Sequence, residues 1–139
     1  MSDENKAVVR RWFEAVNRHD VNAVAELVAP DMVNHSSPNQ GREGVRAEIT
    51  YWLTAFPDAE VPLEEVVAEG DLVSVRHGLI GTHRGEFLGV APTGKKISVQ
   101  EMDIFRIRDG LIVESWSAPD LFGMLKQIGG QSHEPSDEG

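Results

Sequence analysis

The sequence predicts an α+β domain in which three N-terminal helices precede a curved antiparallel or mixed sheet and a short C-terminal helix. Apolar residues recur with the period of a helix as far as residue 56, and alternate as in strands from residue 60 to residue 118. Helices that are segregated from an antiparallel sheet are typical of the α+β class. A long curved sheet wrapped over a few helices would form a cone with an internal pocket for a small apolar ligand.

Three helices are predicted in the N-terminal part of the chain. The first is indicated by an apolar face made of Val8, Val9, Trp12, Phe13 and Val16. Asp20 is placed to cap a short second helix over "VNAVAELV", which Pro30 ends. The apolar stripe of the third helix consists of Val45, Ile49, Trp52, Leu53 and Phe56, and Pro57 stops this helix.

Four strands and a last helix follow. The alternating segments are "EVPLEEVVAEGD" at 60–71, "LVSVRHGLIGTHRG" at 72–85, "ISVQEMDIFRIR" at 97–108 and "LIVESWSA" at 111–118. Asp109–Gly110 between two such segments is a strong signal for a hairpin turn. The last helix begins after Asp120 and ends at Gly129.

Composition limits the class of protein. A length of 139 residues with 40% hydrophobic content suits one domain, assigned to residues 1–130 as a single α+β barrel, followed by a polar acidic tail at 131–139. The net charge of −10 argues against a nucleic-acid partner, since phosphate binding requires clustered Lys and Arg. No apolar run is long enough for a membrane span or a signal peptide, so we expect a cytoplasmic protein without a membrane partner.

Signals for metals and cofactors are weak. The chain has no cysteine, and its histidines are scattered without a His-x-x-x-His pair. The Gly-rich segment "GEFLGVAPTGKK" lacks the GxxxxGK[ST] pattern of a phosphate-binding loop. We therefore expect no metal and no cofactor.

Several side chains are candidates for binding a substrate. His35, preceded by Asn34, follows an apolar run and could act as an acid, a base or a hydrogen-bond donor at a cavity mouth, or could be an exposed loop residue. Asn34 could orient a carbonyl group or support a turn. Alternation places His77 on the apolar face of its strand with Val75 and Leu79, where it is a core residue or faces a cavity, and places Arg76 on the opposite face.

Strand 97–108 offers two faces. One carries Val99, Glu101, Asp103, Phe105 and Ile107, and the other carries Gln100, Met102, Ile104 and Arg106. Arg106 could form a surface ion pair with Asp103 or bind an anionic ligand or enolate. Met102 is a further candidate for substrate binding. Trp52 and Trp116 are also candidates, and each is either a core residue or part of an aromatic cavity wall.

The sequence resembles the SnoaL-like polyketide cyclase family, within the nuclear-transport-factor-2-like superfamily. The similarity covers about residues 4–129 and is densest over residues 81–129, in "GTHRGEFLGVAPTGK", "DIFRIRDGLIVESW" and the Asp before "LFGMLKQIG". The resemblance implies a homodimer that packs sheet to sheet, and an intramolecular aldol condensation without metal or organic cofactor. The general acid/base of the family is an aspartate at the end of the last strand, which corresponds to Asp120. A histidine on the preceding strand assists in those enzymes, and "ISVQEMDIFRIR" has none.

These observations leave several functions open. The main prediction is a cofactor-independent cyclase or isomerase acting on a small, largely apolar carbonyl compound, with Asp120 and His35 as catalytic residues. Asp120 could equally be the N-cap of the last helix. The alternatives are a non-catalytic ligand-binding homodimer, and an epoxide hydrolase that would use Asp103, Arg106 and Asp120.

Overall fold

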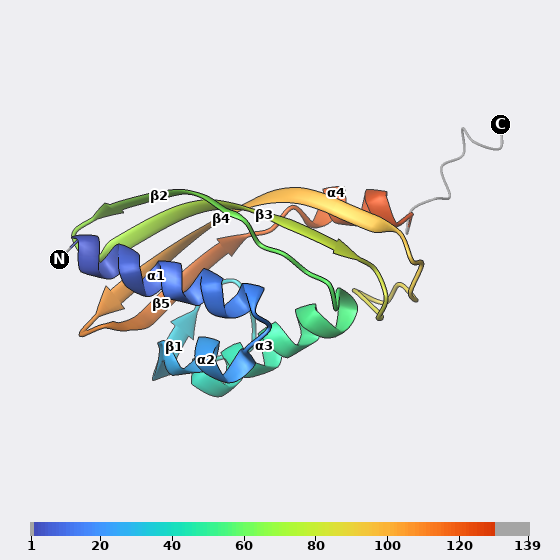
Figure 1. Cartoon of the computed structure of the whole chain (residues 1–139). Helices are drawn as coiled ribbons and strands as arrows, with labels where there is room; N and C mark the ends of the chain where they lie inside the picture. Colours follow the sequence, from blue (N-terminus) through green and yellow to red (C-terminus); the bar gives the residue numbers. More distant parts are fainter. Residues whose placement is uncertain (1, 130–139) are drawn as a thin grey trace.

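The computed structural model describes residues 2–129 and shows a mixed α+β architecture (Figure 1). The predicted polar tail at 131–139 lies outside the described residues. The elements in chain order are α1 (Ser2–Asn17), α2 (Val21–Glu26), β1 (Val28–Asn34), α3 (Gly41–Ala55), β2 (Leu63–Glu69), β3 (Leu72–Thr82), β4 (Lys96–Arg108), β5 (Leu111–Ala118) and α4 (Leu121–Ile128). Among residues 2–129, no helix combines the length and apolar character needed to cross a bilayer.

The sheet has five strands in the order β1-β5-β4-β3-β2. All neighbouring strands are antiparallel except β1 and β5, which are parallel. The sheet is therefore mixed, as predicted, and it is open, with β1 and β2 at its edges, instead of closing into the expected barrel. The predicted hairpin turn between β4 and β5 is confirmed, since Asp109 and Gly110 both have positive φ angles of 51° and 77°.

One prediction about the N-terminal part was wrong. The second helix ends at Glu26, and residues 28–34 form β1, a strand absent from the predicted sheet. The short apolar run fits a helix or a strand equally well, so its periodicity does not separate the two. Pro30 has no N–H group and is incompatible with a helix interior, but an edge strand accepts it because one side of that strand lacks a partner.

The three N-terminal helices cover one face of the sheet, and α4 lies beside β4. Figure 1 shows the curved sheet arching over α1, α2 and α3, while α4 follows β5 and contacts β4. Asp20 caps α2 through Ala23 N, and Asp120 caps α4 through Gly123 N, so both predicted N-caps are confirmed. Gly129, with a φ of 80°, ends α4 in the left-handed conformation that favours glycine.

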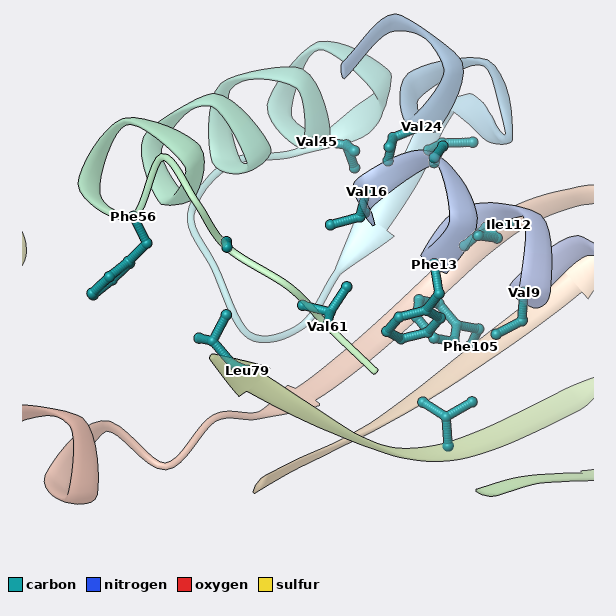
Figure 2. Packing of buried hydrophobic residues seen from close by; sticks show 14 of the residues in the cluster. Val9, Phe13, Val16, Val24, Val45, Phe56, Val61, Leu79, Phe105 and Ile112 are labelled. Carbon is teal, nitrogen blue, oxygen red and sulfur yellow. The ribbon is translucent and has the colours of Figure 1, made fainter. Parts of the chain in front are cut away.

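The hydrophobic core fills part of the space between the helices and the concave face of the sheet (Figure 2). Phe13 of α1 packs against Phe105 of β4, with their ring centroids 6.4 Å apart. Burying one such side chain stabilises the fold by about 1.5–3 kcal/mol. Within this single cluster, Phe56 and Leu79 lie toward one end and Val9 toward the other, with Val61 and Phe13 between them (Figure 2).

The connection between α3 and β2 is fixed to β3 by Asp58. Its carboxylate accepts hydrogen bonds from Thr82 N and Thr82 Oγ1, each 2.7 Å long, and these bonds lower the Asp58 pKa. Thr82 is buried, so its polar groups depend on this partner.

Asp58→Ala is accordingly expected to reduce the free energy of unfolding by about 1–2 kcal/mol, because the buried polar groups of Thr82 lose their acceptor. Urea denaturation at neutral pH measures the change. Glu60→Ala is the matched control, since the Glu60 side chain is exposed and its backbone, which the substitution keeps, pairs with Ile80. Equal stability of both variants and the unchanged protein would contradict this role of Asp58.

Candidate active site

A largely apolar cavity lies between α1, α3 and the concave face of the sheet. Its empty space is about 1100 Å³, part of which is open to solvent. Pockets bind small organic molecules when a few polar groups are placed among apolar walls. The polar residues that line the cavity are Asn34, Ser36, Ser37, Glu48, His77, Glu101, Asp103, Ser115 and Ser117.

Three of these residues form a compact cluster on the sheet: His77 of β3, and Glu101 and Asp103 of β4. In the antiparallel register His77 pairs directly with Glu101, and Asp103 pairs with Val75, two residues away from His77. The period of two along each strand directs all three side chains to the concave face. The register of a single hairpin therefore assembles the cluster.

Both ring nitrogens of His77 make close polar contacts. His77 Nδ1 lies 2.9 Å from Gly78 O, which only accepts hydrogen bonds, so this nitrogen carries a proton. His77 Nε2 lies 2.9 Å from Asp103 Oδ2 and 3.7 Å from Glu101 Oε1. Burial acts to lower the His77 pKa, but the hydrogen bond and negative charge of Asp103 outweigh it and raise this pKa above 6.5. The cluster thus favours a histidinium ion paired with Asp103.

Glu101 is the group best placed for proton transfer near neutral pH. Burial, followed by repulsion from Asp103 and Asp120, raises its pKa from 4.5 to about 7, although His77 opposes this rise. Its Oε2 atom is buried without a hydrogen-bond partner among residues 2–129. A carboxyl group with a pKa near 7 can both accept and return a proton at neutral pH. Such perturbed groups are concentrated at functional sites.

Three sequence-predicted binding residues line the cavity: Asn34, Trp52 and His77. Asn34 Oδ1 accepts a hydrogen bond of 2.9 Å from Ser36 N, so the turn-supporting role considered for this residue is confirmed. Trp52 donates its Nε1–H to Glu48 Oε2 over 3.1 Å. His77 fits both alternatives, since it is buried with partners for both ring nitrogens and also lines the cavity.

Five other candidates lie outside the cavity lining: His35, Arg76, Met102, Arg106 and Trp116. His35 stacks on Trp116 with ring centroids 4.8 Å apart and contacts Glu114 Oε2 at 2.7 Å. Arg106 donates to Glu114 and Asp71, which lie 2.7 and 2.8 Å away, and not to Asp103. Arg76 contacts the exposed carboxylates of β2. Alternation along β3, β4 and β5 directs the four strand residues to the convex face. Their roles in substrate binding, and the catalytic role of His35, stay predictions.

Asp120 is exposed and caps α4, with Asp120 Oδ1 accepting from Gly123 N at 2.8 Å. It is outside the cavity lining, although the preceding residue, Pro119, is part of it. Its negative charge contributes to the raised pKa of Glu101. The capping role is confirmed, while the acid/base role of Asp120 stays a prediction.

The sequence interpretation did not select Glu101 and Glu48, and considered Asp103 only with Arg106. The sequence did contain an indication of these residues, since Glu101 and Asp103 share the apolar face of β4 with Val99 and Phe105. Carboxylates are rarely buried on an apolar face unless they have a partner. Within residues 2–129, no group of three or more His, Asp or Glu side chains is arranged to hold a metal ion.

Known proteins with similar sequences cover nearly the whole chain. The model of the SnoaL-like polyketide cyclase family matches residues 6–128. The aklanonic acid methyl ester cyclase DnrD of Streptomyces peucetius is 33% identical over 129 residues, which cover 88% of each chain. The nogalonic acid methyl ester cyclase of Streptomyces nogalater is 33% identical over 130 residues, which cover 90% of this chain and 96% of that one.

Solved structures agree with this assignment. TsrD from Streptomyces laurentii superposes with a TM-score of 0.85 at 30% identity, covering 91% of this chain and 96% of TsrD. IdmH from Streptomyces antibioticus gives a TM-score of 0.78 at 34% identity, covering 90% of this chain and 98% of IdmH. With the open α+β sheet and its internal cavity, these similarities show that the chain belongs to the SnoaL-like polyketide cyclase family.

Proposed function

We propose that this protein is a cofactor-independent cyclase that closes a ring in a small, largely apolar carbonyl compound by acid/base catalysis. The observation that carries the proposal is Glu101, a buried carboxyl group with a pKa of about 7 and a free Oε2 atom in an apolar cavity. The relatives named as cyclases of polyketide methyl esters support an ester of this class as the substrate.

The reaction would be an intramolecular aldol addition, in which Glu101 moves one proton. The Glu101 carboxylate removes a proton from a carbon next to a carbonyl group, which leaves an enolate. The enolate carbon attacks a second carbonyl carbon of the same molecule, and the electron pair of that carbonyl bond moves to its oxygen. Glu101 then returns the proton to this oxygen. In total, one C–H bond and the π bond of one carbonyl group are broken, and one C–C bond and one O–H bond are formed, without a further reactant.

His77 and Asp103 would support this proton transfer electrostatically. The histidinium ion lies beside Glu101 and keeps a positive charge next to the place where the negative enolate forms. A preorganised charge in a water-poor cavity stabilises such a transition state more than it would in water. Asp103 keeps the ring oriented and charged through its 2.9 Å contact.

The pH dependence of turnover tests the proposal. Purified protein is incubated with aklanonic acid methyl ester and with nogalonic acid methyl ester, and the cyclised product is quantified by chromatography. We expect the rate to rise with pH around a midpoint of about 7, because the carboxylate form of Glu101 is the base. Binding of both esters without turnover at any pH would instead identify a ligand-binding protein of this fold.

Asp120→Asn distinguishes the two candidate bases. If Glu101 is the base, removal of the negative charge of Asp120 lowers the Glu101 pKa, so the rate midpoint moves to lower pH while the maximal rate is kept. If Asp120 is itself the acid/base, turnover is abolished at every pH. Asn is also a good N-cap, so α4 is retained. Asp20→Asn, at the cap of α2, is the matched control and should leave the profile unchanged.

We also infer that the protein is a homodimer that pairs through the convex face of the sheet. Exposed apolar residues lie there on neighbouring strands: Met102 and Ile104 of β4 are 58% and 40% exposed, and Ile104 pairs with Trp116 of β5. Contiguous apolar surface of this kind favours an interface.

Sedimentation at micromolar concentration should therefore show a dimer. Ile104→Glu should shift the population to monomers, because a two-fold interface would bury the negatively charged Glu side chains of both subunits in the same contact. Leu88→Glu is the control, since Leu88 is 49% exposed but lies in the β3–β4 loop against Tyr51 of α3. A stable monomer of the unchanged protein would contradict the inference.

A further inference from the structure

A polar strip continues from the Glu101 cluster across one side of the cavity. Asp103 of β4 pairs with Ser117 of β5. Ser36 Oγ accepts from Ser117 N at 2.7 Å and donates to Ser117 O at 3.1 Å. The next residue, Ser37, donates its hydroxyl to Glu48 Oε1 over 3.0 Å. The strip therefore leads from the sheet to Glu48 on α3, and all of these residues line the cavity.

Glu48 forms the far end of this strip and retains capacity to accept a hydrogen bond. Its Oε1 atom already accepts from Ser37 and from Asn39 Nδ2, the latter at 2.8 Å. Its Oε2 atom accepts only from Trp52 Nε1, and a carboxylate oxygen has two lone pairs. Within residues 2–129 Glu48 has no ion-pair partner, so a ligand hydroxyl would meet an uncompensated carboxylate. Hydrogen bonds to a charged acceptor are the stronger ones.

The remainder of the cavity is apolar and partly aromatic. The ring centroids of Trp12 and Phe105 are 5.5 Å apart, and those of Phe13 and Phe105 are 6.4 Å apart. All three rings line the cavity. A ligand in this space would turn apolar surface toward the rings and its oxygen atoms toward the strip, because a polar group against the rings would lose its hydrogen bonds.

We propose that Glu48 is a specificity residue that selects fused-ring ligands whose oxygen atoms lie along one edge. One oxygen meets the Glu101 end of the strip, and a hydroxyl group at the other end donates to Glu48 Oε2. The inference rests on the proposed function only in assigning the reacting carbonyl to the Glu101 end. Edge recognition and its test concern binding alone.

Two isomeric probes separate edge recognition from general affinity for aromatic diols. Naphthalene-2,7-diol has both hydroxyl groups on the same long edge, while naphthalene-2,6-diol has them on opposite edges. Isothermal titration calorimetry with the unchanged protein should give roughly tenfold tighter binding of the 2,7 isomer, the effect of one additional hydrogen bond to a charged group. Equal affinities, or no binding of either isomer up to the millimolar range, would overturn the proposal.

Two variants then test Glu48 itself. Glu48→Gln should reduce the isomer preference to nearly one, since the charged acceptor is lost. Trp52→Phe is the matched control, because it removes the donor to Glu48 and leaves the carboxylate, so the preference should persist even if both affinities fall. Loss of preference in both variants, or in neither, would contradict the role of Glu48 as the specificity residue. A persistent preference without turnover of either methyl ester would refute the proposed reaction and leave edge recognition intact.

Discussion

Replacing Glu101 by glutamine is expected to remove most of the turnover and at the same time to stabilise the fold above pH 7. Glutamine has the shape of glutamic acid and cannot exchange a proton, so a loss of about 10²–10⁴-fold in rate is expected for a general acid/base. The gain in stability follows from the raised pKa of Glu101, which is about 7 in the folded protein compared with 4.5 as its ordinary value.

The sign of this effect is set by proton linkage. Between pH 4.5 and about 7 the folded protein keeps a proton that the unfolded chain has released, so stability falls as pH rises through this range. Above pH 7 the full cost of the buried carboxylate is present. One pKa unit corresponds to about 1.4 kcal/mol, and the pKa of about 7 already includes the attraction to His77, so a net stabilisation on the order of 1–3 kcal/mol is expected for Glu101→Gln.

Urea denaturation at pH 5 and pH 8.5 measures this change, and the difference between variant and unchanged protein should grow toward the higher pH. Glu65→Gln is the control because Glu65 is a 67% exposed carboxylate of β2, and its replacement should change neither rate nor stability appreciably. A Glu101→Gln variant with normal turnover would remove Glu101 from the mechanism. A variant that is less stable at pH 8.5 would contradict the buried, costly carboxylate.

Replacing His77 by glutamine is expected to have the largest effect on stability. Removing one partner of a buried ion pair leaves the charge of Asp103 uncompensated, which typically costs about 3–5 kcal/mol. Because the His77 pKa is raised above 6.5, its contribution is fully present below pH 6.5 and is lost as pH rises through the folded pKa. The destabilisation measured by urea denaturation should therefore be larger at pH 6 than at pH 9.

The same variant should also move the activity profile. The positive charge of His77 lowers the Glu101 pKa, so its removal should shift the rate midpoint to higher pH. Asp120→Asn is the counterpart, because the negative charge of Asp120 raises the Glu101 pKa and its loss should shift the midpoint to lower pH. Shifts of both variants in the same direction, or no shift in either, would contradict an electrostatic coupling of the three groups.

Much of the fold followed from local patterns in the sequence. Caps such as Asp20 and Asp120, and the turn at Asp109–Gly110, depend on only a few neighbouring residues, and the structure confirms them. The faces of β3 and β4 followed from alternation in the same way. The exception was β1, which became a strand only because β5 provided a parallel partner far away in the sequence.

The site was predicted less completely, because its properties come from contacts between distant residues. Alternation gave the direction of His77, Glu101 and Asp103, but the register that joins them is a property of the β3–β4 pair. His35 and Arg106 have suitable chemistry, yet they are bonded to Glu114 on the convex face, which no sequence pattern indicated.

The sequence by itself determined the α+β class, the alternating faces of β3 and β4, the caps and the turn, because each depends on the local conformational preferences of the chain. Only the tertiary structure decided which carboxylate lies buried in the cavity. The capped, exposed Asp120 and the buried Glu101 are both carboxylates near the same part of the sheet. Burial and neighbouring charges raise the pKa of Glu101, and those surroundings come from strands and helices that meet only when the whole chain has folded.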